Sequence, residues 1–176
     1  LDLTEGPVVL ELPPGMLGTM NNLWQEPLVD IGGPFSPEQN RGGRFLILPP
    51  NYEQALPTAH FHVVQADTNI VIFYVRAIGE SRADWASLAE GMKKWKQYPL
   101  ADANKPPQTQ FIDITGLEHD TLIPKGIAYF ELLARYINKN PAREQDMAML
   151  GMLETLGIAR GREFAPDARI QKILSE

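Results

Sequence analysis

Two histidines that alternate along a predicted strand are the first residues able to do chemistry in this sequence. His60 and His62 lie in the β-type run 60–64, and because alternate residues of a strand share a face, both rings are expected on one side. Two imidazoles and a carboxylate can hold a divalent metal, with Asp67 or Glu53 as the third ligand. The alternative, a half-exposed pair beside a turn, is favoured because the chain has no cysteine and no third histidine nearby. No other cofactor is predicted.

A glycine loop carries a second candidate site. Arg41 and Arg44 flank two glycines within an otherwise acidic half of the chain. Their guanidinium groups are suited to a carboxylate or phosphate ligand. The competing interpretation, which we favour, is a surface turn whose arginines pair with nearby acids.

Aromatic side chains beside loops suggest a third kind of site. Trp24 and Tyr52 both lie next to predicted turns and form the surface pair that would suit stacking on a ligand such as a carbohydrate. Trp85 and Trp95 lie instead on an apolar stripe of a predicted helix, so core packing is the expected role for both.

Catalytic residues are not identifiable from motifs. The loop Glu118-His119-Asp120 places a carboxylate next to a histidine, as a general base requires, but a solvated turn is the simpler interpretation. None of the four serines lies in a G-x-S-x-G elbow, and the chain has no phosphate-binding loop, G-x-G-x-x-G or H-E-x-x-H motif.

Composition sets the class of protein. The chain has 176 residues, 44% of them hydrophobic, which is enough for a folded core. No apolar run approaches the roughly 20 residues of a membrane span. The net charge of −6 argues against nucleic acid as a partner. Residues 1–80 contain three basic and nine acidic side chains, whereas residues 81–176 contain thirteen of each.

The elements that must position these residues follow from proline and apolar patterning. Nine of the fifteen prolines lie in residues 1–80, which therefore read as short strands joined by turns. Strands are predicted at 7–12, 16–24, 45–48, 60–64, 69–78 and 108–114, with the run 69–78 buried on both faces.

The second half is predicted to be mostly helical. Ser81 and Asp84 form a capping-box pattern at the start of a helix that ends at Pro99. Further helices are predicted at 127–138, from Asn140 to Leu156, and from about Pro166 onward. The expected fold class is α+β: an antiparallel β-rich N-terminal half, arranged as a sandwich-like sheet, followed by a largely helical C-terminal half.

Three segments, read together, resemble one family. They are residues 1–10, 42–52 and 164–174, which read LDLTEGPVVL, GGRFLILPPNY and FAPDARIQKIL. The sequence resembles the DUF1254 family, whose members usually continue into a DUF1214 domain. The resemblance implies a β-rich fold with added helices, and export to the periplasm or outside a Gram-negative cell. It also implies a DUF1254-like domain over 1–163, truncated at its N-terminus, and a junction helix at 164–176 leading toward a missing C-terminal domain.

Three functions are compatible with these features. The favoured one is a non-catalytic binding or assembly module of an exported bacterial protein. The alternative is a hydrolase whose active site forms at the interface with the missing domain. A third is a structural subunit that assembles through open strand edges. The expected partners are another polypeptide chain, the remainder of the same protein, or a second copy in a homo-oligomer.

Overall fold

The first 99 residues contain seven strands in the part of the chain that the structure describes. The computed structural model describes residues 1–57, 60–118 and 120–175. Its strands are β1 (Val8–Leu12), β2 (Met16–Asn22), β3 (Pro27–Ile31), β4 (Gly43–Leu48), β5 (His62–Gln65), β6 (Val71–Ala77) and β7 (Lys96–Pro99). Five of the six strands predicted from the sequence are thereby confirmed in position. The sixth is wrong, because residues 108–114 form no strand.

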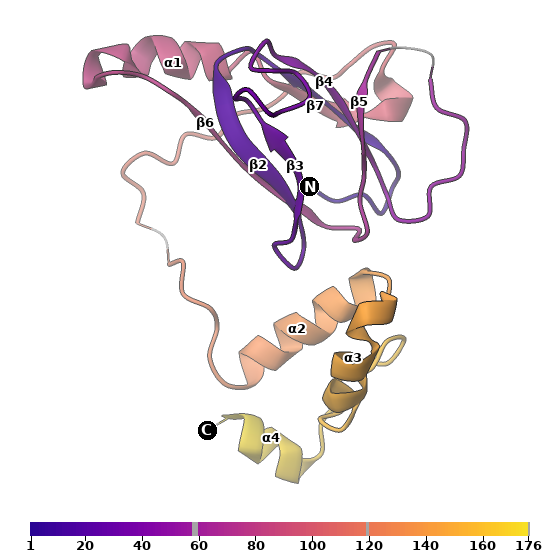
Figure 1. Ribbon diagram of the computed structural model, residues 1–176. Coiled ribbons are helices and arrows are strands. Elements are labelled where there is room, and N and C mark those ends of the chain that lie inside the picture. Colours follow the sequence, from indigo (N-terminus) through magenta and orange to yellow (C-terminus); the bar gives the residue numbers. More distant parts are fainter. Residues whose placement is uncertain (58–59, 119, 176) are drawn as a thin grey trace. The chain divides into compact units, whose positions relative to one another are not determined.

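The strands form two sheets (Figure 1). One has the order β5-β4-β1-β7 and the other the order β3-β2-β6. All neighbours are antiparallel except β4 and β5, which run parallel. A parallel pair needs a longer connection than a hairpin, and the chain between β4 and β5 supplies it. The α+β class and its β-rich first half are confirmed.

The core lies between the two sheets. Alternate residues of β1 (Val8, Leu10 and Leu12) pack in one cluster with Met20 of β2 and Phe45 of β4. The intervening residue Val9 points the other way, into a second cluster on the outer face of the four-stranded sheet with Leu46, Leu48 and Tyr98. β1 is therefore buried on both of its faces, which explains its nearly continuous apolar sequence.

Residues 81–95 fold differently from the predicted long helix. The capping box of Ser81 and Asp84 is present and opens a 3-10 turn, η1 (Arg82–Asp84), which continues into α1 (Trp85–Met92). The helix stops there, and β7 follows. Trp85 is 62% exposed, so its predicted core role is wrong, whereas Trp95 is buried as expected.

Strand β6 also departs from expectation. Tyr74 is 64% exposed, so the strand is not buried on both faces. β6 is an edge strand of the three-stranded sheet, and one face of an edge antiparallel strand is commonly open to water.

The remaining helices form a separate unit. The chain divides into unit 1, Leu1–Ile112, and unit 2, Asp113–Glu176. The short 3-10 turn η2 (Leu100–Asp102) belongs to unit 1. Unit 2 contains α2 (Ile127–Lys139), η3 (Glu144–Asp146), α3 (Met147–Glu154) and α4 (Ala168–Ser175). Its core is a small cluster in which Ala134 and Ile137 of α2 pack with Ile158 and Phe164.

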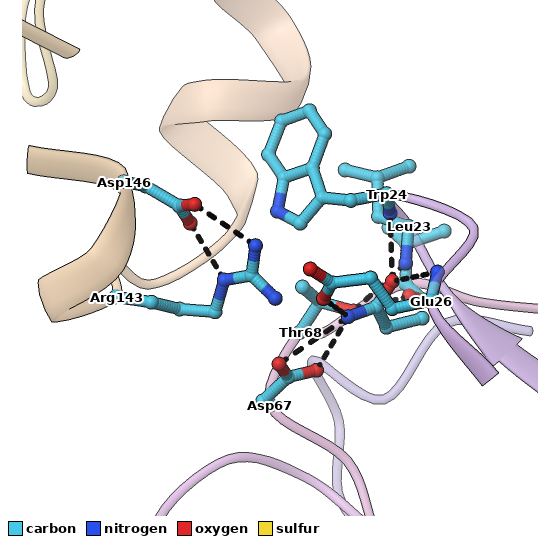
Figure 2. Close-up of polar contacts among 9 residues, drawn as sticks. Leu23, Trp24, Glu26, Asp67, Thr68, Arg143 and Asp146 are labelled. Atoms are coloured by element: carbon cyan, nitrogen blue, oxygen red, sulfur yellow. Dashed lines mark hydrogen bonds and ion pairs between the residues drawn. The ribbon is translucent and has the colours of Figure 1, made fainter. Parts of the chain in front are cut away.

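One predicted helix start in unit 2 is wrong. Asn140 ends α2, since its side chain donates to the Tyr136 carbonyl, and it does not cap a new helix. The next turn instead begins after Arg143, whose guanidinium makes a two-point ion pair with Asp146, at 2.6 and 2.9 Å (Figure 2). The predicted helices at 127–138 and after Pro166 are confirmed as α2 and α4. No helix among the described residues has the length and apolarity needed to cross a membrane.

Candidate functional site

The structure separates the residues predicted to bind a metal. His62 is the first residue of β5, and its ring lies 5.2 Å from that of Phe45, on the core side of the sheet. His60 precedes the strand and is exposed, so the alternation expected of a strand does not apply to it. Over the described ranges 1–57, 60–118 and 120–175, no three His, Asp or Glu side chains form a group suited to a metal ion. The predicted divalent site at His60, His62 and Asp67 therefore gains no geometric support.

Asp67 is part of a different network, centred on the buried side chain of Asn22, whose partners Asp67, Glu26 and Trp24 are labelled in Figure 2. The Asn22 amide donates to Asp67 Oδ1 at 3.0 Å and to Glu26 Oε2 at 2.5 Å. Its oxygen accepts from the backbone N–H groups of Trp24 and Glu26. Asn22 thus fixes the turn between β2 and β3, and this turn sets the position of Trp24.

The glycine loop is held by a buried carboxylate that sequence reasoning missed. Glu38 is only 4% exposed, and its Oε1 accepts from the Gly32 N–H at 2.5 Å. Arg41 bonds within the same loop, to the Gln39 side chain at 2.9 Å and to the Glu38 carbonyl. Arg41 and Arg44 therefore do not converge on one ligand: Arg41 belongs to the loop, and Arg44 belongs to β4.

Arg44 joins a polar cluster on the outer face of the four-stranded sheet. We call Glu11, Arg44, Lys96 and Tyr98 the outer-face cluster. Glu11 lies opposite Arg44 of β4 and Lys96 of β7 in the strand register. Its carboxylate accepts from the Tyr98 hydroxyl at 2.5 Å, and lies 3.1 Å from Lys96 Nζ and 3.6 Å from Arg44 Nε.

Aromatic residues border this cluster. The Arg44 guanidinium lies 4.4 Å from the ring centre of Phe61, a cation–π arrangement. Tyr52 packs against the same outer-face apolar residues. Tyr52 therefore shares a face with Arg44, whereas Trp24 lies at the β2–β3 turn of the other sheet, and the two aromatics do not form the predicted pair.

The pKa shifts of Glu11 and Tyr98 in the outer-face cluster indicate a structural role. Burial alone would raise the pKa of Glu11, but the hydrogen bond from Tyr98 and the charges of Lys96 and Arg44 outweigh it, so the pKa lies below its ordinary value. Burial and the bond to Glu11 raise the pKa of Tyr98. Near neutral pH, Glu11 stays ionised and Tyr98 stays protonated. A general base or acid needs a pKa close to the working pH, and the pKa values of Glu11 and Tyr98 are shifted away from neutral pH. The contacts of Glu11 instead hold strands together and position Lys96.

Lys96 also lines a pocket at the edge of β7, which we call the β7-edge pocket. It has a volume of about 480 Å³ and is formed by Lys93, Lys94, Trp95, Lys96, Pro106, Pro107, Gln108, Thr109 and Phe111. Two chain segments make its walls: the turn that leads from α1 into β7, and the extended residues 106–111. The Gln97 N–H donates to Thr109 Oγ1 at 3.0 Å, which ties the second wall to the strand. Pockets of about 300–1,000 Å³ commonly hold small molecules.

Sequence reasoning missed this pocket. The predicted helix that ends at Pro99 includes the three lysines, and residues 108–114 are predicted as a strand. One signal was available: no lysine occurs before Lys93, and three then surround Trp95. The other candidate, the Glu118-His119-Asp120 loop, depends on His119, which lies outside the described residues.

Unit 2 has a smaller pocket, of about 390 Å³, beside α3. Its charged lining residues are Glu154, Arg160 and Arg162, and Glu154 pairs with Arg162 at 3.6 Å. Its lining contains no aromatic side chain, which makes this pocket a weaker candidate than the one in unit 1 for a planar ligand.

Comparison with known proteins assigns the family. A family model described as a protein of unknown function (DUF1254) matches residues 1–99. The chain belongs to the DUF1254 family. The DUF1254 match ends at the last residue of β7, so it includes every strand described above and one wall of the β7-edge pocket. Residues 106–111, the other wall, follow it.

A solved structure shares the fold. The crystal structure of the VPA0106 protein from Vibrio parahaemolyticus is similar with a TM-score of 0.68 at 16% sequence identity, over 99% of this chain and 44% of that one. This DUF1254 chain therefore spans less than half the length of that protein. At this identity the likeness concerns the fold alone. No curated protein matches the sequence.

Proposed function

We propose that this chain is a non-catalytic binding module of an exported bacterial protein, and that it binds a small molecule in the β7-edge pocket. The observation that carries the proposal is the pocket itself. It combines the apolar surfaces of Pro106, Pro107 and the half-exposed Phe111 with polar groups from Gln108 and Thr109. Apolar walls with a few polar groups are typical of ligand sites.

The fold supports binding by a site formed in advance. Trp95 is buried and stacks on Phe73, with ring centres 5.1 Å apart. Lys96 is held by Glu11 at 3.1 Å, and the opposite wall is tied to β7 through Thr109. A ligand entering such a pocket does not have to order these groups, so little conformational entropy is lost on binding.

A pocket-filling substitution tests the proposal. Gln108→Trp places a large side chain in the pocket, whereas Gln110→Trp makes the same change at an exposed residue nearby that does not line it. A small-molecule library is screened against the full chain by thermal unfolding, since a ligand of the folded state raises Tm. We expect ligands whose stabilising effect is lost in Gln108→Trp and kept in Gln110→Trp.

Two results of this screen would contradict the proposal. Ligands that stabilise both variants equally would place binding elsewhere. A ligand recovered as a hydrolysed product, detected by mass spectrometry after incubation, would favour a hydrolase.

Export is part of the proposal. The chain has no cysteine, so it cannot form a wrong disulfide in an oxidising compartment. The family resemblance also implies export. Fractionation of the native bacterium, followed with an antibody to this chain, should find the protein in the periplasm or medium. Recovery with the cytoplasmic fraction would contradict this part.

Assembly is a second candidate role, favoured by one observation. Large apolar side chains are exposed between residues 111 and 123, namely Phe111, Ile112, Ile114, Leu117, Leu122 and Ile123. Exposed apolar groups in one segment commonly mark a contact with another polypeptide. Light scattering of the wild type and of Ile112→Ser with Leu122→Ser tests this role: a wild-type dimer that dissociates in the double variant supports assembly, and a wild-type monomer opposes it.

A further inference from the structure

The lysines of unit 1 are concentrated at the β7-edge pocket. Unit 1 has four lysines, at 93, 94, 96 and 105, and the first three line the pocket. The same unit has twelve acidic side chains against eight basic ones, but no Asp or Glu is among the lining residues, all of which the structure describes. A concave site lined by charge of one sign focuses the field and attracts the opposite charge.

The three ammonium groups are not equivalent. Lys93 pairs with Glu90 at 2.6 Å, and Lys96 pairs with Glu11 at 3.1 Å. The Lys94 side chain makes no hydrogen bond or ion pair within the described part of the chain. One of the three positive charges is therefore available for a ligand, which matches an anion with a single negative charge.

The rest of the lining suits a flat apolar group. Trp95 is fixed by its stacked contact with Phe73. Pro106 and Pro107 add rigid apolar surface in the opposite wall, and Phe111 is 49% exposed. A planar ligand against the exposed surfaces of Pro106, Pro107 and Phe111 would remove apolar area from water, which is favourable.

We propose that the β7-edge pocket binds a small organic monoanion, a carboxylate on a flat apolar body, with Lys94 pairing the carboxylate. This inference rests on the proposed function and adds the chemical class of the ligand. The carboxylate lies at the lysine side of the pocket, and the ring system lies against the apolar wall of Pro106, Pro107 and Phe111.

The test uses 2-naphthoate as the probe and 2-naphthylmethanol as its neutral analogue. Binding to the full chain is measured by isothermal titration calorimetry at low ionic strength. The central variant is Lys94→Gln, and the matched control is Lys105→Gln, which removes the same charge from the one lysine of unit 1 outside the pocket. Both lysines are exposed, so neither variant is expected to disturb folding, and thermal unfolding checks this.

We expect naphthoate to bind the wild type and to bind Lys94→Gln about two- to fivefold more weakly, as loss of an ion pair with an exposed lysine predicts. Lys105→Gln should bind it as the wild type does. The alcohol should bind more weakly than naphthoate, with the same affinity in both lysine variants. Raising the salt concentration should weaken only the binding of naphthoate.

The failures of the two proposals are distinguishable. If the alcohol binds as tightly as naphthoate and Gln108→Trp abolishes both, the anion class is wrong and the binding module stands. If Lys105→Gln weakens naphthoate as much as Lys94→Gln does, general charge attraction explains the result and the assigned role of Lys94 is wrong. If neither compound binds and the library screen also finds no ligand of the pocket, both proposals are wrong.

Discussion

At the scale of single residues, the carboxylate of Glu11 connects three strands. Its oxygens meet Tyr98, Lys96 and Arg44, which come from the strands on either side of β1. Hydrogen bonds to a charged group are stronger than those between neutral groups. One carboxylate on the central strand therefore supports both neighbouring strands and fixes a lysine of the pocket.

Replacing Glu11 should lower stability in a pH-dependent way. The pKa of Glu11 in the folded chain lies below its ordinary value of 4.5, so its stabilising contribution is complete above that pH and is lost as the pH falls through the lowered pKa. We expect Glu11→Gln to reduce the free energy of unfolding by about 1–3 kcal/mol at pH 7. Urea unfolding measured from pH 7 downward should show the difference from wild type shrinking below pH 4.5.

The control is Glu5→Gln, at an exposed residue outside the network. It should leave stability nearly unchanged across the same pH range. A Glu11→Gln deficit that stays constant from pH 7 into the acid range would show that the charge of Glu11 contributes nothing, and that only its shape matters.

At the scale of elements, strand β2 depends on close backbone approach. β2 lies between β3 and β6 in its sheet. A Cβ on Gly18 would lie 1.9 Å from the Tyr74 carbonyl oxygen of β6. Only glycine fits there without a shift of the backbone.

Two glycine-to-alanine changes should therefore have opposite effects. Gly18→Ala should lower the free energy of unfolding by about 2 kcal/mol or more, because the sheet has to open to admit the methyl group. In Gly91→Ala the added methyl group has no neighbouring atom within 4 Å. Residue 91 lies in α1, where alanine is favoured over glycine by about 1 kcal/mol. Urea unfolding of both variants checks this, and a stable Gly18→Ala would contradict the described packing of β2 against β6.

Elements were predictable wherever their signal is local. β1, β4 and α2 carry apolar runs or stripes that neighbouring residues alone reveal. β7 was missed because Lys96–Pro99 has only one buried side chain, Tyr98, and its strand character comes from pairing with β1, far away in the sequence. The pocket was not predictable for the same reason: its walls meet through the hydrogen bond from Gln97 to Thr109, which no local sequence pattern indicates.

The roles of two predicted site residues also depend on long-range contacts. Asp67 and Arg44 were predicted as site residues, but their partners Asn22 and Glu11, distant in the sequence, decide their roles.

At the scale of the whole molecule, the two units have separate cores. The clusters between and outside the sheets belong to unit 1, and the cluster of Ala134, Ile137 and Ile158 belongs to unit 2. A unit with its own core can fold by itself. Every residue of the β7-edge pocket lies in unit 1.

The fragment 1–112 should therefore fold alone and keep its pocket. We expect a dispersed NMR spectrum, a single cooperative urea transition, and affinity for naphthoate within about twofold of the full chain, a small free-energy difference. An unfolded fragment would show that unit 1 needs the rest of the chain. A folded fragment with no affinity would show that residues after 112 contribute to binding.

The central place of β1 in its sheet also has a consequence for folding during synthesis of the chain. β1 is translated before both of its neighbouring strands, and Tyr98, which bonds to Glu11, follows Glu11 by 87 residues. At about 5–20 residues per second on the ribosome, the segment Val8–Leu12 waits for several seconds before its last neighbour is made. An apolar strand without partners can pair wrongly with other chains. In the nascent chain this segment therefore stays without its full set of strand partners until β7 has emerged.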